Sequence, residues 1–112
     1  MNQVNLVGRV AREPKFKTSS NGKSMIFLTV AIDGYYDRKT KEVTTDFIPV
    51  TVWGKEAERC RSLIKGSLVR ITGRVSVGKF PDKETGEIKY VTDIIGEEVQ
   101  FLAKPKGASS NE

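Results

Sequence analysis

The stretch Asp46-Phe47-Ile48-Pro49-Val50-Thr51-Val52-Trp53-Gly54 alternates between two kinds of side chain with a period of two residues. Successive side chains of a β-strand point to opposite faces, so Ile48, Val50 and Val52 would share one face. Phe47 and Trp53 would share the other face. The stretch therefore predicts a strand over residues 46–53 that has an aliphatic core face and an aromatic second face.

The same alternation continues on both sides of this strand. A first strand begins at Val4 and includes Val10, and a second covers residues 25–32, with its even-numbered apolar residues on one face. A fourth strand is expected over residues 67–77, and a fifth over 87–102 with an interruption near Gly96. Pro14 and residues 18–22 indicate a break and a turn after the first strand, and the polar segments 37–42 and 81–86 indicate further turns.

One helix is expected, over residues 55–65, where Ala57, Cys60 and Ile64 would share a buried face. Gly66 would end it in a left-handed conformation. The order is three strands, a helix and two strands, with no alternation of strands and helices. This order predicts an all-β fold, a five-stranded small barrel with one helix between strands 3 and 4.

Length and charge define the class of protein. The chain has 112 residues and a mass of 12.5 kDa, and its 19 Lys and Arg exceed its 14 Asp and Glu by five charges. We expect one domain over residues 1–103 and a disordered polar tail over residues 104–112. No apolar run approaches the length of a membrane span, and Met1-Asn2-Gln3 does not begin a secretory signal, so a cytoplasmic protein is expected.

The composition argues against most enzyme chemistry. The chain has no histidine and only one cysteine, which excludes Ser-His and Cys-His nucleophile pairs and the common zinc sites. Cys60 is expected to be a small buried hydrophobic residue rather than a reactive thiol. A metal-dependent nuclease would need clustered carboxylates, and Asp33, Asp37 and Asp46 are the nearest candidates, but turns commonly carry solvated aspartates. We therefore expect no catalytic activity, no cofactor and no bound metal.

The aromatic residues suggest a binding function. In a basic protein, exposed rings such as Phe47 and Trp53 are typical of proteins that bind single-stranded nucleic acid, where bases stack on rings and Lys and Arg follow the phosphates. The alternative is that the rings pack into a protein–protein interface. Tyr36 and Phe80 lie beside basic hairpins and extend the pattern, although period two alone does not choose between Tyr35 and Tyr36, because Gly34 can shift the register.

Two segments are similar to each other: Leu6-Val7-Gly8-Arg9-Val10 and Ile71-Thr72-Gly73-Arg74-Val75. We interpret the shared glycine as a bend or bulge of the kind that closes a barrel. The alternative is that Arg9 and Arg74 belong to one basic surface.

An ordered series of short motifs resembles the bacterial single-stranded DNA-binding protein family over residues 2–103. The motifs are Asn2-Gln3-Val4-Asn5-Leu6-Val7-Gly8-Arg9-Val10, Arg12-Glu13-Pro14, Asn21-Gly22, Thr45-Asp46-Phe47-Ile48, Val52-Trp53-Gly54-Lys55, Ala57-Glu58, Lys65-Gly66-Ser67-Leu68-Val69, Gly73-Arg74-Val75 and Tyr90-Val91-Thr92-Asp93. The resemblance implies an OB-fold that binds single-stranded DNA without sequence preference in replication, recombination or repair.

The resemblance also implies which residues bind DNA. The stacking aromatics would be Tyr36, Phe47, Trp53 and Phe80, and the basic contacts Arg9, Lys55, Arg74 and Lys79. It further implies a homo-oligomer, usually a tetramer, located in the cytoplasm with the nucleoid. Replicative members carry an acidic tail that recruits other replication proteins. Residues 109–112 have no such character, so recruitment of this kind is not expected. A preference for RNA over DNA is not decided by these residues, because stacking and phosphate contacts are common to both.

Overall fold

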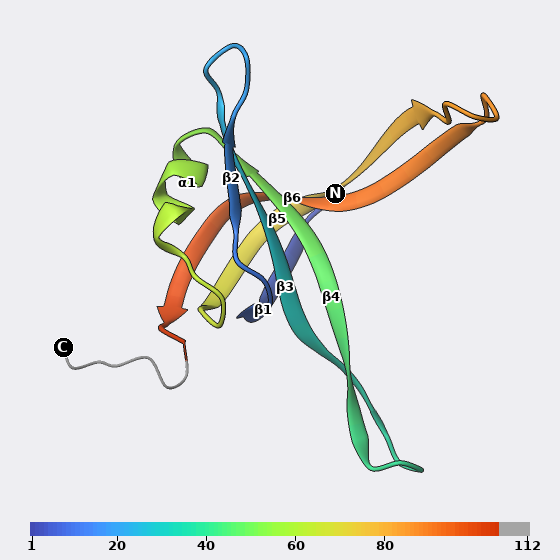
Figure 1. Cartoon of the computed structure of the whole chain (residues 1–112). Helices are drawn as coiled ribbons and strands as arrows, with labels where there is room; N and C mark the ends of the chain where they lie inside the picture. The colour runs from blue at the N-terminus through green and yellow to red at the C-terminus, as the bar shows by residue number, and fades with distance from the viewer. Residues whose placement is uncertain (106–112) are drawn as a thin grey trace.

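The computed structural model describes residues 1–105, and most of them lie in strands of one continuous sheet (Figure 1). The elements in chain order are β1 (Val4–Val10), β2 (Lys15–Thr18), β3 (Ser24–Asp37), β4 (Glu42–Trp53), α1 (Gly54–Arg59), the 3₁₀ helix η1 (Cys60–Ser62), β5 (Leu68–Pro81) and β6 (Ile88–Ala103). Within the described residues, no helix is long and apolar enough to span a membrane.

The sheet closes into a barrel through β1. The strand order is β1-β5-β6-β4-β3-β2, and β1 also pairs with β3 at Arg9–Ala31 and Val10–Val30. Neighbouring strands are antiparallel except β4 and β6, which run parallel. Strand β2 pairs only with β3 and lies outside the closed ring. The predicted five-stranded barrel with a helix after its third strand is confirmed, and its topology is that of an OB-fold.

The barrel interior is filled by aliphatic side chains from the predicted core faces. Strand β3 contributes Ile26, Leu28 and Val30, and β4 contributes Val50 and Val52, all of which are buried. The helical segment closes one end of the barrel with three further buried residues, Ala57, Cys60 and Leu63. Burial raises the pKa of the Cys60 thiol to about 11, and the nearby charge of Glu56 acts in the same direction. The expectation that Cys60 is a buried hydrophobic residue is confirmed.

The helix is shorter than predicted. It ends at Ser62 rather than at residue 65, and its last three residues form a 3₁₀ turn. A 3₁₀ helix has three residues per turn, so the residue that follows Cys60 into the core is Leu63, while Ile64 is 49% exposed. Gly66 has the expected positive φ, 95°, but lies in the loop to β5, where its N–H donates to the carbonyl of Val10 at 2.7 Å.

One strand was missed and three strand ends were predicted wrongly, among them the end of β3, which continues to Asp37 rather than to residue 32. The segment after Pro14 contains the four-residue strand β2, whose single apolar residue, Phe16, gives too little alternation to be recognised. Strand β4 begins at Glu42 and β5 continues to Pro81, because β3–β4 and β5–β6 remain paired well beyond the core. These extensions project from the barrel as two hairpin arms (Figure 1). Arm residues have no core to face, so their sequence lacks the hydrophobic alternation.

The two similar segments, residues 6–10 and 71–75, each place a glycine where a neighbouring strand approaches closely. A Cβ added to Gly8 would collide with the carbonyl oxygen of Ala31, and one added to Gly73 would collide with that of Ile95. The β5–β6 register shifts beside Gly73, which pairs with Gly96 and leaves Glu97 without a partner on β5. The interruption expected near Gly96 is therefore a β-bulge. The interpretation of the shared glycine as a bend or bulge is confirmed at Gly73, whereas at Gly8 the β1–β5 register is regular and the glycine allows β1 to approach β3 closely instead.

We predict that Gly73→Ala destabilises the fold by about 1–3 kcal/mol, the usual cost of forcing extra atoms into a packed site. Gly78→Ala in the same strand is the matched control, because its Cβ would meet nothing closer than 4.0 Å. It should leave stability unchanged or raise it by up to about 1 kcal/mol, since alanine has fewer unfolded conformations than glycine. Urea unfolding at equal protein concentration measures both, and equal midpoints for the two variants would contradict the steric role of Gly73.

Candidate nucleic-acid interface

The outer surface of β3 and β4 carries the aromatic side chains that have no place in the core. Trp53 is 38% exposed and lies opposite Met25, and Phe47 is 60% exposed and lies opposite Ala31. Both side chains point away from the barrel interior, as the alternation of residues 46–53 predicts. We call the outward-facing side of β3 and β4, from Met25 and Trp53 to Ala31 and Phe47, the aromatic face.

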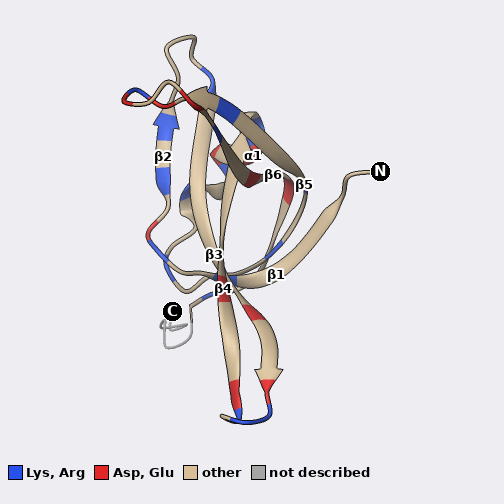
Figure 2. Ribbon diagram, turned by 90° about the vertical axis from the view of Figure 1, so that its right-hand side faces the viewer, with Lys and Arg blue, Asp and Glu red and all other residues tan. Residues whose placement is uncertain are grey.

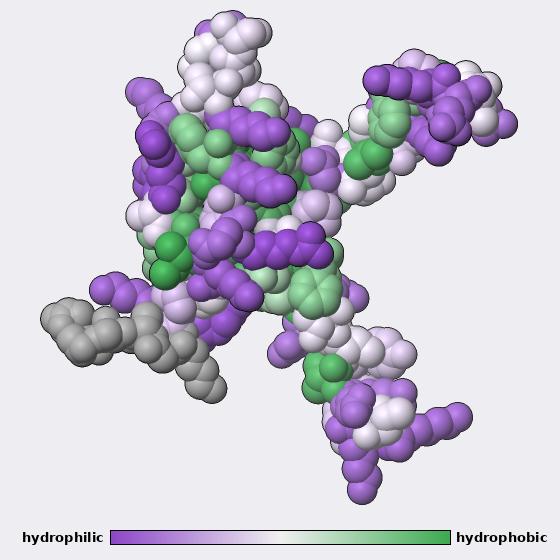
Figure 3. Space-filling model, viewed as in Figure 1, coloured by the Kyte–Doolittle hydropathy of each residue, from purple (hydrophilic) through white to green (hydrophobic). Residues whose placement is uncertain are grey.

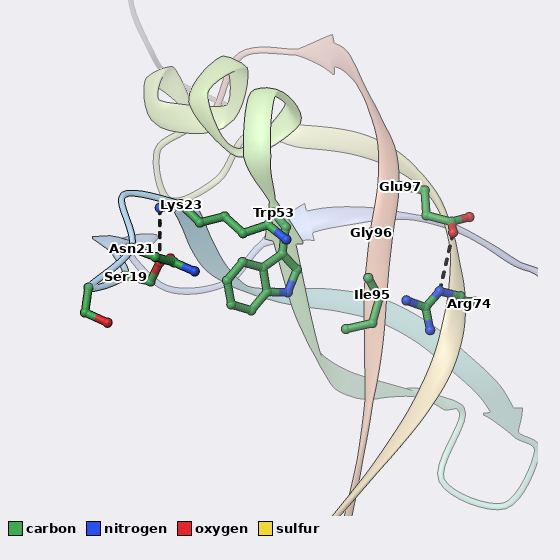
Figure 4. Close-up of a pocket in the computed structure, with 9 residues that line it drawn as sticks. Ser19, Asn21, Lys23, Trp53, Arg74, Ile95, Gly96 and Glu97 are labelled. Atoms are coloured by element: carbon green, nitrogen blue, oxygen red, sulfur yellow. Dashed lines mark hydrogen bonds and ion pairs between the residues drawn. The ribbon is translucent and has the colours of Figure 1, made fainter.

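A groove of about 720 Å³ lies beside Trp53 (Figure 4). One wall comes from the β2–β3 hairpin, where the ammonium of Lys23 lies 5.4 Å from the centre of the indole. The opposite wall comes from β5 and β6, with Arg74 and Ile95. Arg74 forms an ion pair of 3.4 Å with Glu97, the residue left unpaired by the bulge. We call this the Trp53 groove.

The Trp53 groove suits a planar ring carrying a negative charge. A ring that stacks on the indole would lie between two cations, Lys23 and Arg74, which could each contact an attached anion. Glu97 offsets part of this charge. Its ion pair with Arg74 is about half exposed on both sides, and such pairs contribute roughly 0–1 kcal/mol, so an incoming phosphate can compete for the guanidinium.

A bulge decides which tyrosine of the β3–β4 arm lies on the side of the aromatic face. The register shifts between Asp33 and Tyr36, because residues 34 and 35 together oppose the single residue Thr44. Tyr36 consequently pairs with Val43 and faces the same side as Phe47, whereas Tyr35 faces the other side. The hydroxyl of Thr44 accepts the N–H of Tyr35 at 3.0 Å and holds the bulge. Both rings are exposed, Tyr36 by 55%.

Phe80 lies on the β5–β6 arm, opposite Lys89, with 46% of its surface exposed. Alternation along β5 places Phe80 on the same side of the arm as Arg74. Lys79 lies on the other side, where it is paired with Tyr90 of β6. An ion pair of 2.9 Å between Lys89 and Asp82 stiffens the end of this arm and lowers the pKa of Asp82. Both basic and acidic residues lie at the tips of the two arms (Figure 2).

The remaining predicted basic residues lie at two different places. Arg9 pairs with Ala31 on β3, and Ala31 in turn pairs with Phe47 on β4. Arg9 lines a groove of about 560 Å³. Its guanidinium donates a hydrogen bond of 2.7 Å to the carbonyl of Gly66. Lys55 is exposed and follows Trp53 by two residues, at the start of α1. Arg9 and Arg74 line separate grooves.

The structure thus brings Trp53 and Arg74 to one groove and places Phe47 and Arg9 further along the same surface, while Tyr36 and Phe80 lie on different arms (Figure 1). Lys23 was not predicted, because only the fold of the hairpin brings it over the indole. Among residues 1–105, no three of the His, Cys, Asp and Glu side chains are close enough together to hold a metal ion.

Comparison with known proteins shows the family of the chain. The model of the single-strand binding protein family matches residues 1–102. Single-stranded DNA-binding protein 1 of Clostridium acetobutylicum is 41% identical over 110 residues, which cover 96% of this chain and 99% of that protein. Single-stranded DNA-binding protein 1 of Staphylococcus aureus is 34% identical over 113 residues, which cover all of this chain and 71% of that protein. The chain therefore belongs to the single-strand binding protein family.

Proposed function

We propose that this protein binds single-stranded DNA without sequence preference and protects it during replication, recombination or repair, in the cytoplasm with the nucleoid. Residues 1–103 form the binding domain, and the activity is binding rather than catalysis. Tyr36, Phe47, Trp53 and Phe80 stack on bases. Arg9, Lys55, Arg74 and Lys79 contact phosphates. The preference for single strands follows from the rings, because a base must leave its duplex partner before it can stack on a side chain.

The observation that carries the proposal is the Trp53 groove. It combines an exposed indole with a cation on each side, Lys23 and Arg74, and so offers a stacking surface together with phosphate contacts. Every base has a flat π-face, so a site of this kind accepts any sequence. Membership of the single-strand binding protein family and the printed names of the relatives support the same ligand.

We further propose that the DNA wraps around a homo-oligomer, expected to be a tetramer. The side of the β5–β6 arm that faces away from Phe80 exposes Val77 and Tyr90, by 54% and 63%. Lys79 lies on this side too, so its ammonium would reach a phosphate only from the edge of the contact between chains. Burying such apolar surface between chains would stabilise an assembly. The expectation that no acidic tail recruits other proteins falls on residues 106–112, which lie outside the described residues.

Sedimentation equilibrium should give four times the 12.5 kDa mass of the chain. Val77→Lys should shift the distribution to smaller species, because a charge on this apolar surface must be desolvated in the assembly. Lys83→Gln at the tip of the same arm is the control and should not change it. A single species of one chain mass at micromolar concentration would contradict the oligomer.

The first functional test uses Trp53, the only tryptophan, as a fluorescent probe. Its emission should be strongly quenched by oligo-dT and only weakly by duplex DNA, and oligo-rU measures any preference for RNA. If about five phosphates are neutralised, log affinity should fall with log salt at a slope near roughly −3.5. Absence of quenching by all three ligands, together with a blue-shifted spectrum of the free protein, would instead indicate that the rings are buried in a protein–protein interface.

The second test compares the two adjacent tyrosines of the β3–β4 arm. Trp53→Ala and Tyr36→Ala should each weaken oligo-dT binding by about 1–3 kcal/mol, the cost of losing one stacked base. Tyr35→Ala is the matched control, since this ring is at least as exposed as that of Tyr36 but faces the other side of the arm. Anisotropy of a labelled oligonucleotide measures all three variants, and thermal unfolding verifies that they are folded. Equal effects of Tyr35→Ala and Tyr36→Ala would rule out the assigned stacking role of Tyr36.

A further inference from the structure

A second groove lies on the outer surface of β2 and β3, and its lining includes none of the site residues predicted from the sequence. Its volume is about 360 Å³, and its lining is Arg12, Glu13, Lys15, Lys17, Phe27 and Thr29. We call it the β2–β3 groove. Long hydrophilic side chains lie across apolar surface over these two strands (Figure 3), and two basic bands mark β2 (Figure 2).

Phe27 is the aromatic centre of the β2–β3 groove. It is 37% exposed and lies opposite Lys15 on β2 and opposite Thr51 on β4. The ammonium of Lys17 lies 5.7 Å from the centre of its ring. The arrangement repeats that of the Trp53 groove, where Lys23 lies 5.4 Å from the indole centre.

The register makes the two grooves neighbours. Trp53 follows Thr51 by two residues on β4, so Phe27 and Trp53 are diagonal neighbours on the same face of an antiparallel pair. Such positions are separated by roughly 7–8 Å, within reach of aromatic side chains. The two rings therefore form one continuous stacking surface, extending from β4 to the basic strand β2.

The charges of the β2–β3 groove favour an anionic ligand. None of its three cations, Arg12, Lys15 and Lys17, forms an ion pair within the described part of the chain. The single carboxylate, Glu13, accepts the backbone N–H of Lys65 at 2.9 Å. By contrast, Arg59 and Arg61 also cover aromatic rings, but each is paired with a glutamate of its own helix.

A structural role explains only part of this arrangement. Lysines on an edge strand such as β2 discourage pairing with another chain, which accounts for Lys15 and Lys17. It does not account for an exposed phenylalanine on β3, a strand that is paired on both sides at this position. An unpaired cation over an exposed ring is the combination that stacks a base and binds its phosphate.

We propose that the β2–β3 groove is an additional contact site for single-stranded nucleic acid, in which Phe27 stacks on a base and Lys15, Lys17 and Arg12 bind phosphates. The strand that stacks on Trp53 continues over Phe27 onto β2. When the base stacks on Phe27, Lys17 leaves the face of the ring and binds a phosphate of the nucleic acid. This inference rests on the proposed function, because it extends the path of the same ligand.

The test measures binding of labelled oligo-dT by anisotropy for two groups of variants. Phe27→Thr keeps a strand-forming residue and removes the ring, and it should weaken binding roughly 5- to 150-fold. Phe27→Tyr keeps a ring and should bind within about twofold of the parent protein. The double variant Lys15→Gln/Lys17→Gln should make the salt slope shallower by about 1.4, which corresponds to two phosphate contacts.

The control for the lysine pair is Arg70→Gln/Lys104→Gln. This double variant also removes two positive charges, from exposed positions on β5 and just after β6. It should leave the slope of log affinity against log salt unchanged. If the parent binds oligo-dT and both Phe27→Thr and the lysine variant bind with parental affinity and slope, the inference is wrong while the proposed function stands. If the parent does not bind, the proposed function itself fails.

Two further measurements distinguish a loss of DNA contacts from a loss of the fold and from a change in assembly. Thermal unfolding identifies a variant that has lost its fold, and the lysine pair, fully on the surface, still tests the groove if Phe27→Thr does not fold. Sedimentation shows whether the variants alter the assembly. A change in oligomeric state with unchanged DNA affinity would mean that β2 contacts another copy of the chain, which would overturn the inference.

Discussion

The narrow interior of the barrel is the constraint on which the rest of the structure depends. Every fully buried side chain is an aliphatic residue of moderate size or Cys60, and none of the five Phe, three Tyr and one Trp belongs to the buried core. At Gly8 and Gly73 neighbouring strands approach so closely that there is no room for a Cβ, and at Gly96 the core side chains leave little room for one. The aromatic residues therefore lie outside, and the same closure that stabilises the fold creates an outer surface of exposed rings.

Much of this could be predicted from the sequence, because burial imposes a period of two. The core faces of β3 and β4 and the exposure of Phe47 and Trp53 follow from this alternation, and the closing helix follows from the helical spacing of Ala57 and Cys60. The prediction was wrong in segments where burial does not impose this alternation. The arms have no core to face, β2 is an edge strand with one apolar residue, and the 3₁₀ turn replaces Ile64 with Leu63 in the core. Lys23 and Phe27 were missed as site residues because their roles depend on neighbours brought close only by folding.

The cations over aromatic rings fall into two groups with different physical roles. Arg59 is fixed by Glu56 and by the carbonyl of Val99, and Arg61 by Glu58, so these guanidinium groups help to attach the helix to the barrel. Lys17 and Lys23 have only the ring beneath them within the described residues. An exposed contact of that kind contributes about 0.5–1 kcal/mol, less than a stacked base. If the strand follows the proposed path, such lysines would exchange the ring for a phosphate at little cost.

The bulge at residues 34–35 has a consequence for how the β3–β4 arm can vary in length. On the barrel side of the bulge, the barrel fixes the register of β3 against β4. On the side of the tip, only the pairing of the two strands fixes it. The arm can therefore lengthen or shorten by one residue on each strand without disturbing the core. An odd step reverses which side every more distant ring faces, whereas an even step preserves it. An even step thus changes the reach of the arm while it keeps both the orientation of the rings and the fold of the barrel.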